Sequence, residues 1–256
     1  MEKGKKVGLN WKNVNKVSFI ALCAIFLLTL ATLIYTIIIG DLVKIGLTVS
    51  ALVIYLIPSF ITYKFKLHFP TMLEITYYLF VFAALILGEV FAFYGPFPFW
   101  DIVLHLLSGF VMAGIGLSIV EIANKSEKSR LFALVFAFCF SMTLGTMWEC
   151  VEFTFDMVLR TDAQKDAHVR QISTITLQRD GGNRPVRLDD IEKTDIYLQD
   201  GETVTINEGF LDIGIIDTMK DVYVNMTGAT LFCILGSFYL KNNKNVIVKN
   251  LIATKS

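Results

Sequence analysis

The sequence predicts an all-α polytopic membrane protein with about six transmembrane helices and a small β-rich extracytoplasmic insertion between helices 5 and 6. Three observations lead to this fold class. The chain is 54% hydrophobic, which is more apolar than is usual for a soluble domain. Long apolar runs recur along it, and each approaches the roughly 20 residues that a helix needs to cross a bilayer. Basic residues gather in alternate joints between these runs.

Six apolar runs are long enough to cross a membrane. The first follows a Lys-rich start, as the apolar core of a signal peptide would, but it is longer than the roughly 7–15 residues of such a core. We therefore expect the first run to remain in the protein as a helix. The six predicted spans are about 17–39, 43–63, 72–94, 102–121, 131–157 and 215–240.

The basic residues predict the orientation of the helices, because Lys and Arg in short loops favour the cytoplasmic side. With six crossings, four basic segments fall on one side of the membrane, whereas the joints at 40–41 and 95–100 contain no Lys or Arg. Both termini are therefore expected in the cytoplasm. The basic residues are Lys3, Lys5, Lys6, Lys12 and Lys16, then Lys64 and Lys66, then Lys125, Lys128 and Arg130, then Lys241, Lys244, Lys249 and Lys255.

The region between the fifth and sixth helices has a different composition. An Ile- and Thr-rich run at 171–178 precedes turn residues at 180–183. A second pair of runs, 195–199 and 203–207, flanks Asp200-Gly201, and Gly after Asp is a hairpin signal. We expect two β-hairpins here, and a disordered loop is the alternative. The predicted parts of the chain are thus 1–159 with helices 1–5, the insertion 160–212, and 213–256 with helix 6 and a cytoplasmic tail.

Polar side chains gather near the predicted outer ends of the helices, and in each helix their spacing places them on one face. Asp101 and His105 are four residues apart at the start of the fourth helix, as are Asp217 and Asp221 in the sixth. The topology brings these residues and the acids of the fifth helix to the same side of the membrane. The acids are Glu89, Asp101, Glu149, Glu152, Asp156, Asp217 and Asp221, and Asn225 continues the line of the sixth helix.

Carboxylates close together repel one another, so such a group needs protons, cations or water. Divalent cations take oxygen ligands, and a histidine among carboxylates also suits Mn or Zn. We hypothesise a site for Mg, Mn or Zn, with His105 as ligand or general base and Glu149 or Glu152 as ligand or proton donor. Alternatively, the acids are solvated helix ends, where charges cost less than at a helix centre. The predicted metal ligands are Asp101, His105, Glu149, Glu152, Asp217 and Asp221.

Three polar blocks carry a family resemblance. They are Phe99-Trp100-Asp101 through His105 and Gly109, then Trp148-Glu149-Cys150-Val151-Glu152 with Asp156, then Asp217 through Asp221, Asn225 and Gly228. These blocks resemble the YjdF-like family of inner-membrane proteins, and their order is similar to that in the wider VanZ-like group. The resemblance covers about residues 71–240 and implies a small multi-pass protein of the bacterial plasma (inner) membrane, without implying a mechanism. Glu152 stands where the VanZ-like pattern has Gln, and the 160–212 insertion is longer than either group leads us to expect.

Three functions are compatible with this sequence. The outer polar cluster could act, with a divalent metal ion, on lipid or cell-envelope head groups, which would then be partners besides the membrane lipids. The protein could instead be an ion- or proton-coupled transporter, or a non-catalytic scaffold whose insertion binds a partner. Whether it is an enzyme, and its oligomeric state, stay open. The zero net charge gives no indication of nucleic acid, and no Gly-rich phosphate loop, GxSxG or HExxH motif is present.

Overall fold

The computed structural model describes residues 16–65, 67–123, 129–242 and 246–255. The chain divides into two compact units: unit 1 comprises Met1–Gly145 and Val224–Ser256, and unit 2 comprises Thr146–Tyr223. Several basic residues behind the predicted orientation lie outside the described residues, namely Lys3, Lys5, Lys6, Lys12, Lys66, Lys125, Lys128 and Lys244.

Six helical spans among the described residues are long and apolar enough to cross a membrane. This confirms the predicted all-α polytopic fold class. Five spans agree closely with the predicted limits, whereas the third ends at Val90 instead of residue 94. The spans are Lys16–Ile39, Leu42–Lys64, Thr71–Val90, Trp100–Ala123, Arg130–Leu159 and Ile215–Lys241.

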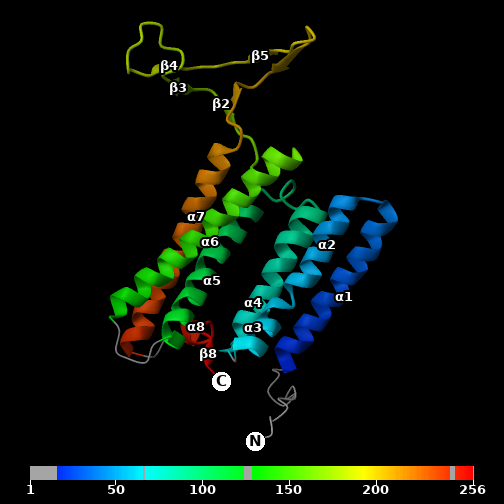
Figure 1. Ribbon diagram of the computed structural model, residues 1–256, viewed down its shortest axis with the longest axis vertical. Coiled ribbons are helices and arrows are strands. Elements are labelled where there is room, and N and C mark those ends of the chain that lie inside the picture. The colour runs from blue at the N-terminus through cyan, green and yellow to red at the C-terminus, as the bar shows by residue number, and fades with distance from the viewer. Residues whose placement is uncertain (1–15, 66, 124–128, 243–245, 256) are drawn as a thin grey trace, which may run out of the picture. The chain divides into compact units, whose positions relative to one another are not determined.

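Unit 1 is built mainly from helices (Figure 1). Two long helices, α6 (Arg130–Leu159) and α7 (Ile215–Asn242), contribute residues to both units. The other elements of unit 1 are α1 (Lys16–Ile39), α2 (Leu42–Ile54), α3 (Ile57–Phe65), β1 (Leu67–His68), α4 (Thr71–Val81), the π-helix η2 (Phe82–Val90), α5 (Trp100–Ala123), α8 (Val246–Lys249) and β8 (Thr254–Lys255).

The second span is broken into α2 and α3 beside Pro58. Proline has no backbone N–H, and its ring excludes a regular helical bond to the carbonyl four residues earlier. That carbonyl, on Ile54, instead accepts a hydrogen bond from the hydroxyl of Tyr77 at 2.8 Å. The break therefore creates a polar link between the second span and α4.

The third span changes from α-helix to π-helix at Phe82 and ends at Val90. The chain then turns through Ala92, whose φ is +55°, and the ring of Tyr94 returns onto Gly88. A Cβ at Gly88 would lie 2.8 Å from that ring. The absence of a side chain at position 88 therefore lets the chain fold back four residues before the limit expected from the apolar run.

Unit 1 has two apolar clusters. One joins α1, α2, α4 and η2 around the fully buried Tyr55 and Ile86, and Figure 1 shows α1, α2 and α4 side by side. In this cluster Thr29 Oγ1 and the Tyr55 hydroxyl share a hydrogen bond of 3.2 Å. The other cluster joins α5, α6, α7 and the C-terminal segment around Leu117 and Phe232.

The second cluster depends on a close backbone contact between α5 and α7. A Cβ at Gly109 would collide with the carbonyl oxygen of Asn225, and a Cβ at Gly228 would collide with that of Leu106. Apolar burial drives helices together only weakly in lipid, so close packing of small residues contributes more there than in water. The two glycines therefore determine how near these helices can approach.

The C-terminal segment packs into the helix bundle, unlike the simple tail that the sequence predicts. Val248, Leu251 and Ile252 are buried in the second cluster, and the backbone N–H of Ala253 donates to Ser118 Oγ at 2.9 Å. The segment packs there because a short apolar run follows the last basic residues of α7. This run is too short to be predicted as a membrane span from the sequence.

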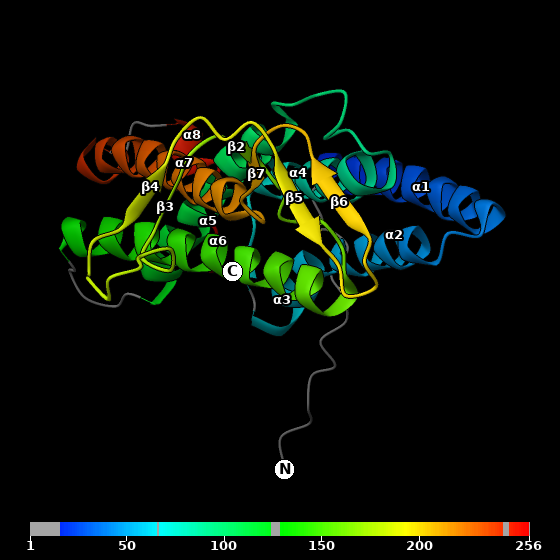
Figure 2. The ribbon, with the colours of Figure 1, turned by 90° about the horizontal axis from the view of Figure 1, so that it is seen from above.

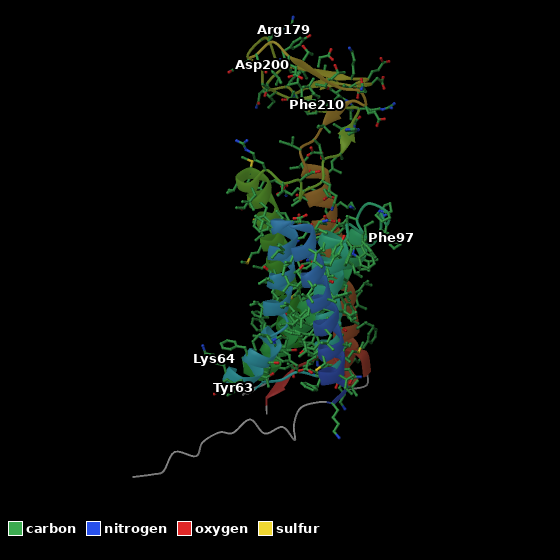
Figure 3. All side chains as sticks on the ribbon, turned by 90° about the vertical axis from the view of Figure 1, so that its right-hand side faces the viewer. Tyr63, Lys64, Phe97, Arg179, Asp200 and Phe210 are labelled. Carbon is green, nitrogen blue, oxygen red and sulfur yellow. The ribbon has the colours of Figure 1, made fainter. Side chains whose placement is uncertain are left out.

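Strand β8 pairs antiparallel with β1, which joins the C-terminal segment to the 64–70 joint. Figure 3 shows Tyr63 and Lys64 at this end of unit 1, which we call the basic end. Phe97 lies at the opposite end, which we call the aromatic end. The joint at 64–70 and the C-terminal segment thus lie at one end of unit 1, as the distribution of basic residues predicts.

Unit 2 contains three antiparallel strand pairs. The hairpin predicted around Asp200-Gly201 is confirmed, and Figure 2 shows its strands side by side. The first predicted hairpin has shorter strands than expected and closes a wider loop. The pairs are β2 (His168–Val169) with β7 (Phe210–Leu211), β3 (Ile172–Thr174) with β4 (Val186–Leu188), and β5 (Thr194–Tyr197) with β6 (Thr203–Ile206).

Asp212 joins the base of the insertion to the start of α7. Its carboxylate accepts hydrogen bonds from the backbone N–H groups of Ala167 at 2.7 Å, Ile216 at 2.7 Å and Gly214 at 3.2 Å. Partial burial acts to raise the pKa of Asp212, but these three donors together hold the pKa below its ordinary value. The charged form is therefore the one that the folded unit stabilises.

Replacing Asp212 with Ala should loosen the base of the insertion, because three backbone donors lose a charged acceptor. We expect a loss of about 1–3 kcal/mol of local stability, measured as faster hydrogen–deuterium exchange at the amides of Ala167, Gly214 and Ile216. Because the folded pKa is lowered, the wild-type contribution is present above the ordinary carboxyl pKa of about 3.9 and disappears as the pH falls through the lower value. The exposed Asp180, changed to Ala, is the control, and equal effects of the two variants would contradict this role.

Replacing Gly109 with Ala should force α5 and α7 apart, because the added methyl meets the backbone of Asn225. We expect a destabilisation of roughly 1–3 kcal/mol, as for overpacking in a dense core, measured by unfolding the purified protein in detergent. Gly46 in α2 is the matched control, since no atom lies within 4 Å of a Cβ placed there. The Gly46→Ala variant should be as stable as wild type or slightly more so, and similar destabilisation of both variants would refute the close contact.

Candidate functional site

The aromatic end of unit 1 holds an acid–imidazole pair on α5. Asp101 Oδ1 and His105 Nε2 lie 3.6 Å apart, and the two side chains are only 16% and 11% exposed. The predicted i, i+4 spacing therefore places both groups on one face, as expected. A carboxylate oxygen and an imidazole nitrogen are both atom types that bind divalent cations.

Trp100 positions the start of α5 just before this pair. Its indole N–H donates to the carbonyl of Ala83 in η2 at 3.2 Å, and its ring contacts those of Phe93 and Phe97. The sequence predicts an interfacial aromatic belt here. The structure adds a specific role for Trp100, which joins the first turn of α5 to the neighbouring π-helix.

A polar contact lies one helical turn further along α5. The hydroxyl of Ser141 on α6 donates to the carbonyl of Gly109 at 2.8 Å. The side-chain amide of Asn225 on α7 lies 3.5 Å from the carbonyl of Ser141, and Asn225 is only 2% exposed. Among the described residues, Asn225 Oδ1 accepts no hydrogen bond. Sequence reasoning found Asn225 but missed Ser141, which is one of several hydroxyl residues in the apolar run of α6.

In unit 2, two of the predicted site carboxylates are nearly buried. Glu149 on α6 is 5% exposed, and Asp221 on α7 is 2% exposed. Lys220 Nζ lies 3.3 Å from Asp217 Oδ1 and 3.9 Å from Asp221 Oδ1. Asp217 also accepts a hydrogen bond from the backbone N–H of Lys165 at 3.2 Å. The predicted pair Asp217 and Asp221 is therefore bridged by a cation of the same helix.

Two other acids of α6 make local hydrogen bonds. Glu152 Oε1 accepts the indole N–H of Trp148 at 2.8 Å. Asp156 accepts the backbone N–H groups of Ala163 at 2.6 Å and Gln164 at 2.8 Å. Asp156 therefore anchors the chain that leaves α6. In unit 1, Glu89 is exposed at the end of η2.

The predicted site residues thus form two groups, one in each unit. Unit 1 brings Asp101 and His105 together, and unit 2 brings Asp217 and Asp221 together around Lys220. Glu149 is buried, whereas Glu152 is engaged with Trp148. Most of the possible metal-ligand atoms in both groups are carboxylate oxygens, and His105 supplies the imidazole nitrogen.

The comparisons with known proteins support the assignment to the membrane, and none of the matching proteins has a described activity. An uncharacterized protein of Thermotoga maritima is 32% identical over 84 residues, which cover 31% of this chain and 41% of that relative, so the chain matches less than half of the relative's length. No solved structure matches the chain. The model of the DUF2238 family, described as predicted membrane proteins, matches residues 20–242. Since this match includes nearly all of the six apolar spans, the chain belongs to the DUF2238 family and is a multi-pass membrane protein.

Proposed function

We propose that this protein binds a divalent cation at the pair of Asp101 and His105 in α5 and acts there on lipid or cell-envelope head groups. The observation that carries the proposal is the nearly buried pair of Asp101 and His105, with 3.6 Å between Oδ1 and Nε2. Two ligand atoms of one Zn ion, each about 2.1 Å from it, lie roughly 3–4 Å apart. The separation of the pair is compatible with such joint ligation.

We include Asp221 and Glu149 as further proposed ligands. Asp221 lies one helical turn before Asn225 on the same face of α7, and Glu149 lies one turn after Gly145 on α6. Both side chains are nearly buried, and charged groups in such surroundings are usually compensated by cations or hydrogen bonds. Glu152 and Asp217, which accept hydrogen bonds from Trp148 and from the backbone of Lys165, are proposed as supporting acids.

The proposed chemistry follows from the donor set. When bound, a divalent cation would polarise a phosphoryl oxygen or lower the pKa of a coordinated water. If His105 does not ligate the cation, it can accept a proton as general base, and a Glu149 that does not ligate the cation can donate a proton to a leaving group. Mg or Mn suits the oxygen-rich set best, and His105 also permits Zn.

The orientation of the protein is part of the same proposal. We propose a bacterial plasma-membrane location with both termini in the cytoplasm, because the 64–70 joint and the C-terminal segment share the basic end of unit 1. The aromatic end, with Asp101 and His105, would then face the extracytoplasmic side. We also propose that the DUF2238 match corresponds to the YjdF-like resemblance, and the likeness to VanZ-like proteins stays a prediction.

Manganese binding tests the cation site directly. Titration of the detergent-purified protein with Mn²⁺, followed by electron paramagnetic resonance, should show a bound ion in wild type. The variants His105→Asn, Asp101→Asn and Asp221→Asn should each weaken binding tenfold or more, since each loses a proposed ligand. Glu89→Gln is the control, because Glu89 is an exposed carboxylate of unit 1, and equal weakening by all four variants, or no binding by wild type, would reject the site.

Head-group chemistry needs a separate test. Wild-type protein with Mn²⁺ should convert phosphate-bearing lipids of a bacterial membrane extract, with products identified by mass spectrometry, and Glu149→Gln should lower the rate by at least about a hundredfold, as for loss of a general acid. A scaffold predicts a different ranking, in which deletion of 165–208 abolishes function in cells and Glu149→Gln is silent. A transporter predicts ion flux in vesicles that depends on Glu89 or Asp101.

A further inference from the structure

Asn225 carries a buried polar atom that no described residue satisfies. The residue is 2% exposed and lies in the part of α7 that belongs to unit 1. Its amide nitrogen Nδ2 contacts α6, where the carbonyl oxygen of Ser141 lies 3.5 Å away and the sulfur of Met142 lies 3.7 Å away. The amide oxygen Oδ1 accepts no hydrogen bond from the described residues. A buried acceptor of this kind costs free energy unless a donor reaches it.

The surroundings of this amide favour a small donor. A Cβ at Gly145 in α6 would lie 2.6 Å from Nδ2 and 3.1 Å from Oδ1 of Asn225, so the amide packs directly on the backbone of α6. On the other side, a Cβ at Gly109 in α5 would collide with the backbone carbonyl of Asn225. With backbone on both sides, the group that donates to Oδ1 must be small, and water is the usual partner of buried polar atoms that the chain leaves unsatisfied.

The amide lies one helical turn from the acid–imidazole pair of α5. Gly109, which meets Asn225, follows His105 by four residues, so the two positions share one face of α5 and are about 6 Å apart along its axis. The helices α5 and α7 run in the same direction, since Gly109 meets Asn225 and Gly114 meets Phe232. Side chains of a helix lean toward its N-terminus. Those of His105 and Asn225 therefore lean the same way, and one turn still separates them.

A water molecule on a bound cation has the reach to join these two groups. Mg²⁺ holds its oxygen ligands at about 2.1 Å, and a water among them can donate to an acceptor about 2.8 Å further on. The ion and the acceptor are then up to about 5 Å apart, close to the one-turn separation of His105 and Asn225. Mg²⁺ in proteins usually keeps several waters and is bound directly by few side chains. An acceptor one turn away from a pair of ligands suits such a hydrated ion.

We propose that Asn225 Oδ1 accepts a hydrogen bond from a water molecule carried by the cation at Asp101 and His105. This inference rests on the proposed cation site and adds a positioning residue to it, because Asn225 acts on the ion through water and does not ligate it. It also specifies the class of cation. A cation that keeps water, such as Mg²⁺ or Mn²⁺, uses this acceptor, whereas Zn²⁺ in a closed four-ligand site does not.

Mn²⁺ binding by the full chain in detergent tests the role of Asn225. Asn225→Leu removes the acceptor at nearly constant side-chain size and should weaken Mn²⁺ binding about tenfold or more, as loss of a residue that supports metal ligands does. Asn225→Ala should show the same loss, and it cannot crowd Gly145. Asn225→Asp keeps an oxygen here but lacks Nδ2, and it should bind Mn²⁺ at least as tightly as wild type. An amide whose only task is to donate to Ser141 predicts instead that Asn225→Asp loses affinity as Asn225→Leu does.

Pulsed electron paramagnetic resonance in D2O measures the water on the bound ion. Mn²⁺ in wild type should show the deuterons of at least one coordinated water. A bound Mn²⁺ ion without such deuterons would overturn the inference, because no water of the ion could then donate to Asn225.

Ser141→Ala is the matched control, since it removes a buried hydrogen bond to Gly109 beside the same amide and leaves Oδ1 of Asn225 in place. Its affinity for Mn²⁺ should equal that of wild type. Equal losses in Ser141→Ala and Asn225→Leu, or wild-type affinity in Asn225→Leu, would overturn the role of Asn225 while the cation site stands. A wild-type protein that binds no Mn²⁺ would instead reject the cation site itself, so the two failures are distinguishable.

Discussion

The backbone contact between α5 and α7 at Gly109 and Gly228 is the constraint on which the second core of unit 1 depends. Lipid tails are as apolar as leucine, so helices in a membrane gain little from burying apolar side chains and rely on close packing and hydrogen bonds. With these glycines in contact, Asn225 is buried and Ser141 reaches the carbonyl of Gly109. The positions of Asn225 and Ser141 inside the bundle therefore follow from the close approach of the helix backbones.

The carboxylates near the ends of α5, α6 and α7 differ in how their charge is compensated. Asp156 and Asp212 accept several backbone N–H groups, and they connect the β-strands of unit 2 to its helices. Asp101 has an imidazole beside it, and Asp221 has the ammonium group of Lys220 within 3.9 Å. Asp156 and Asp212, which accept backbone N–H groups, hold the chain in place. Asp101 lies beside His105, and this pair offers atoms that could bind a cation, so we propose the cation site there.

The two ends of unit 1 have opposite chemistry. The basic end carries lysines and a groove built partly by the C-terminal segment. The aromatic end carries Phe97 and Trp100, followed directly by Asp101 and His105. The two ends of unit 1 therefore present different side chains to their surroundings.

The sequence by itself determined the six spans, the β-hairpin at Asp200-Gly201 and the acid–imidazole pair, because each follows from local length, turn chemistry or helical spacing. It could not foresee the π-helix that ends the third span, the buried C-terminal segment or the role of Ser141. Those features depend on Tyr94 returning to Gly88, Ala253 reaching Ser118 and Ser141 meeting Gly109. Tertiary structure decided them because the partners are distant along the chain or depend on a local turn, and neither leaves a periodic pattern.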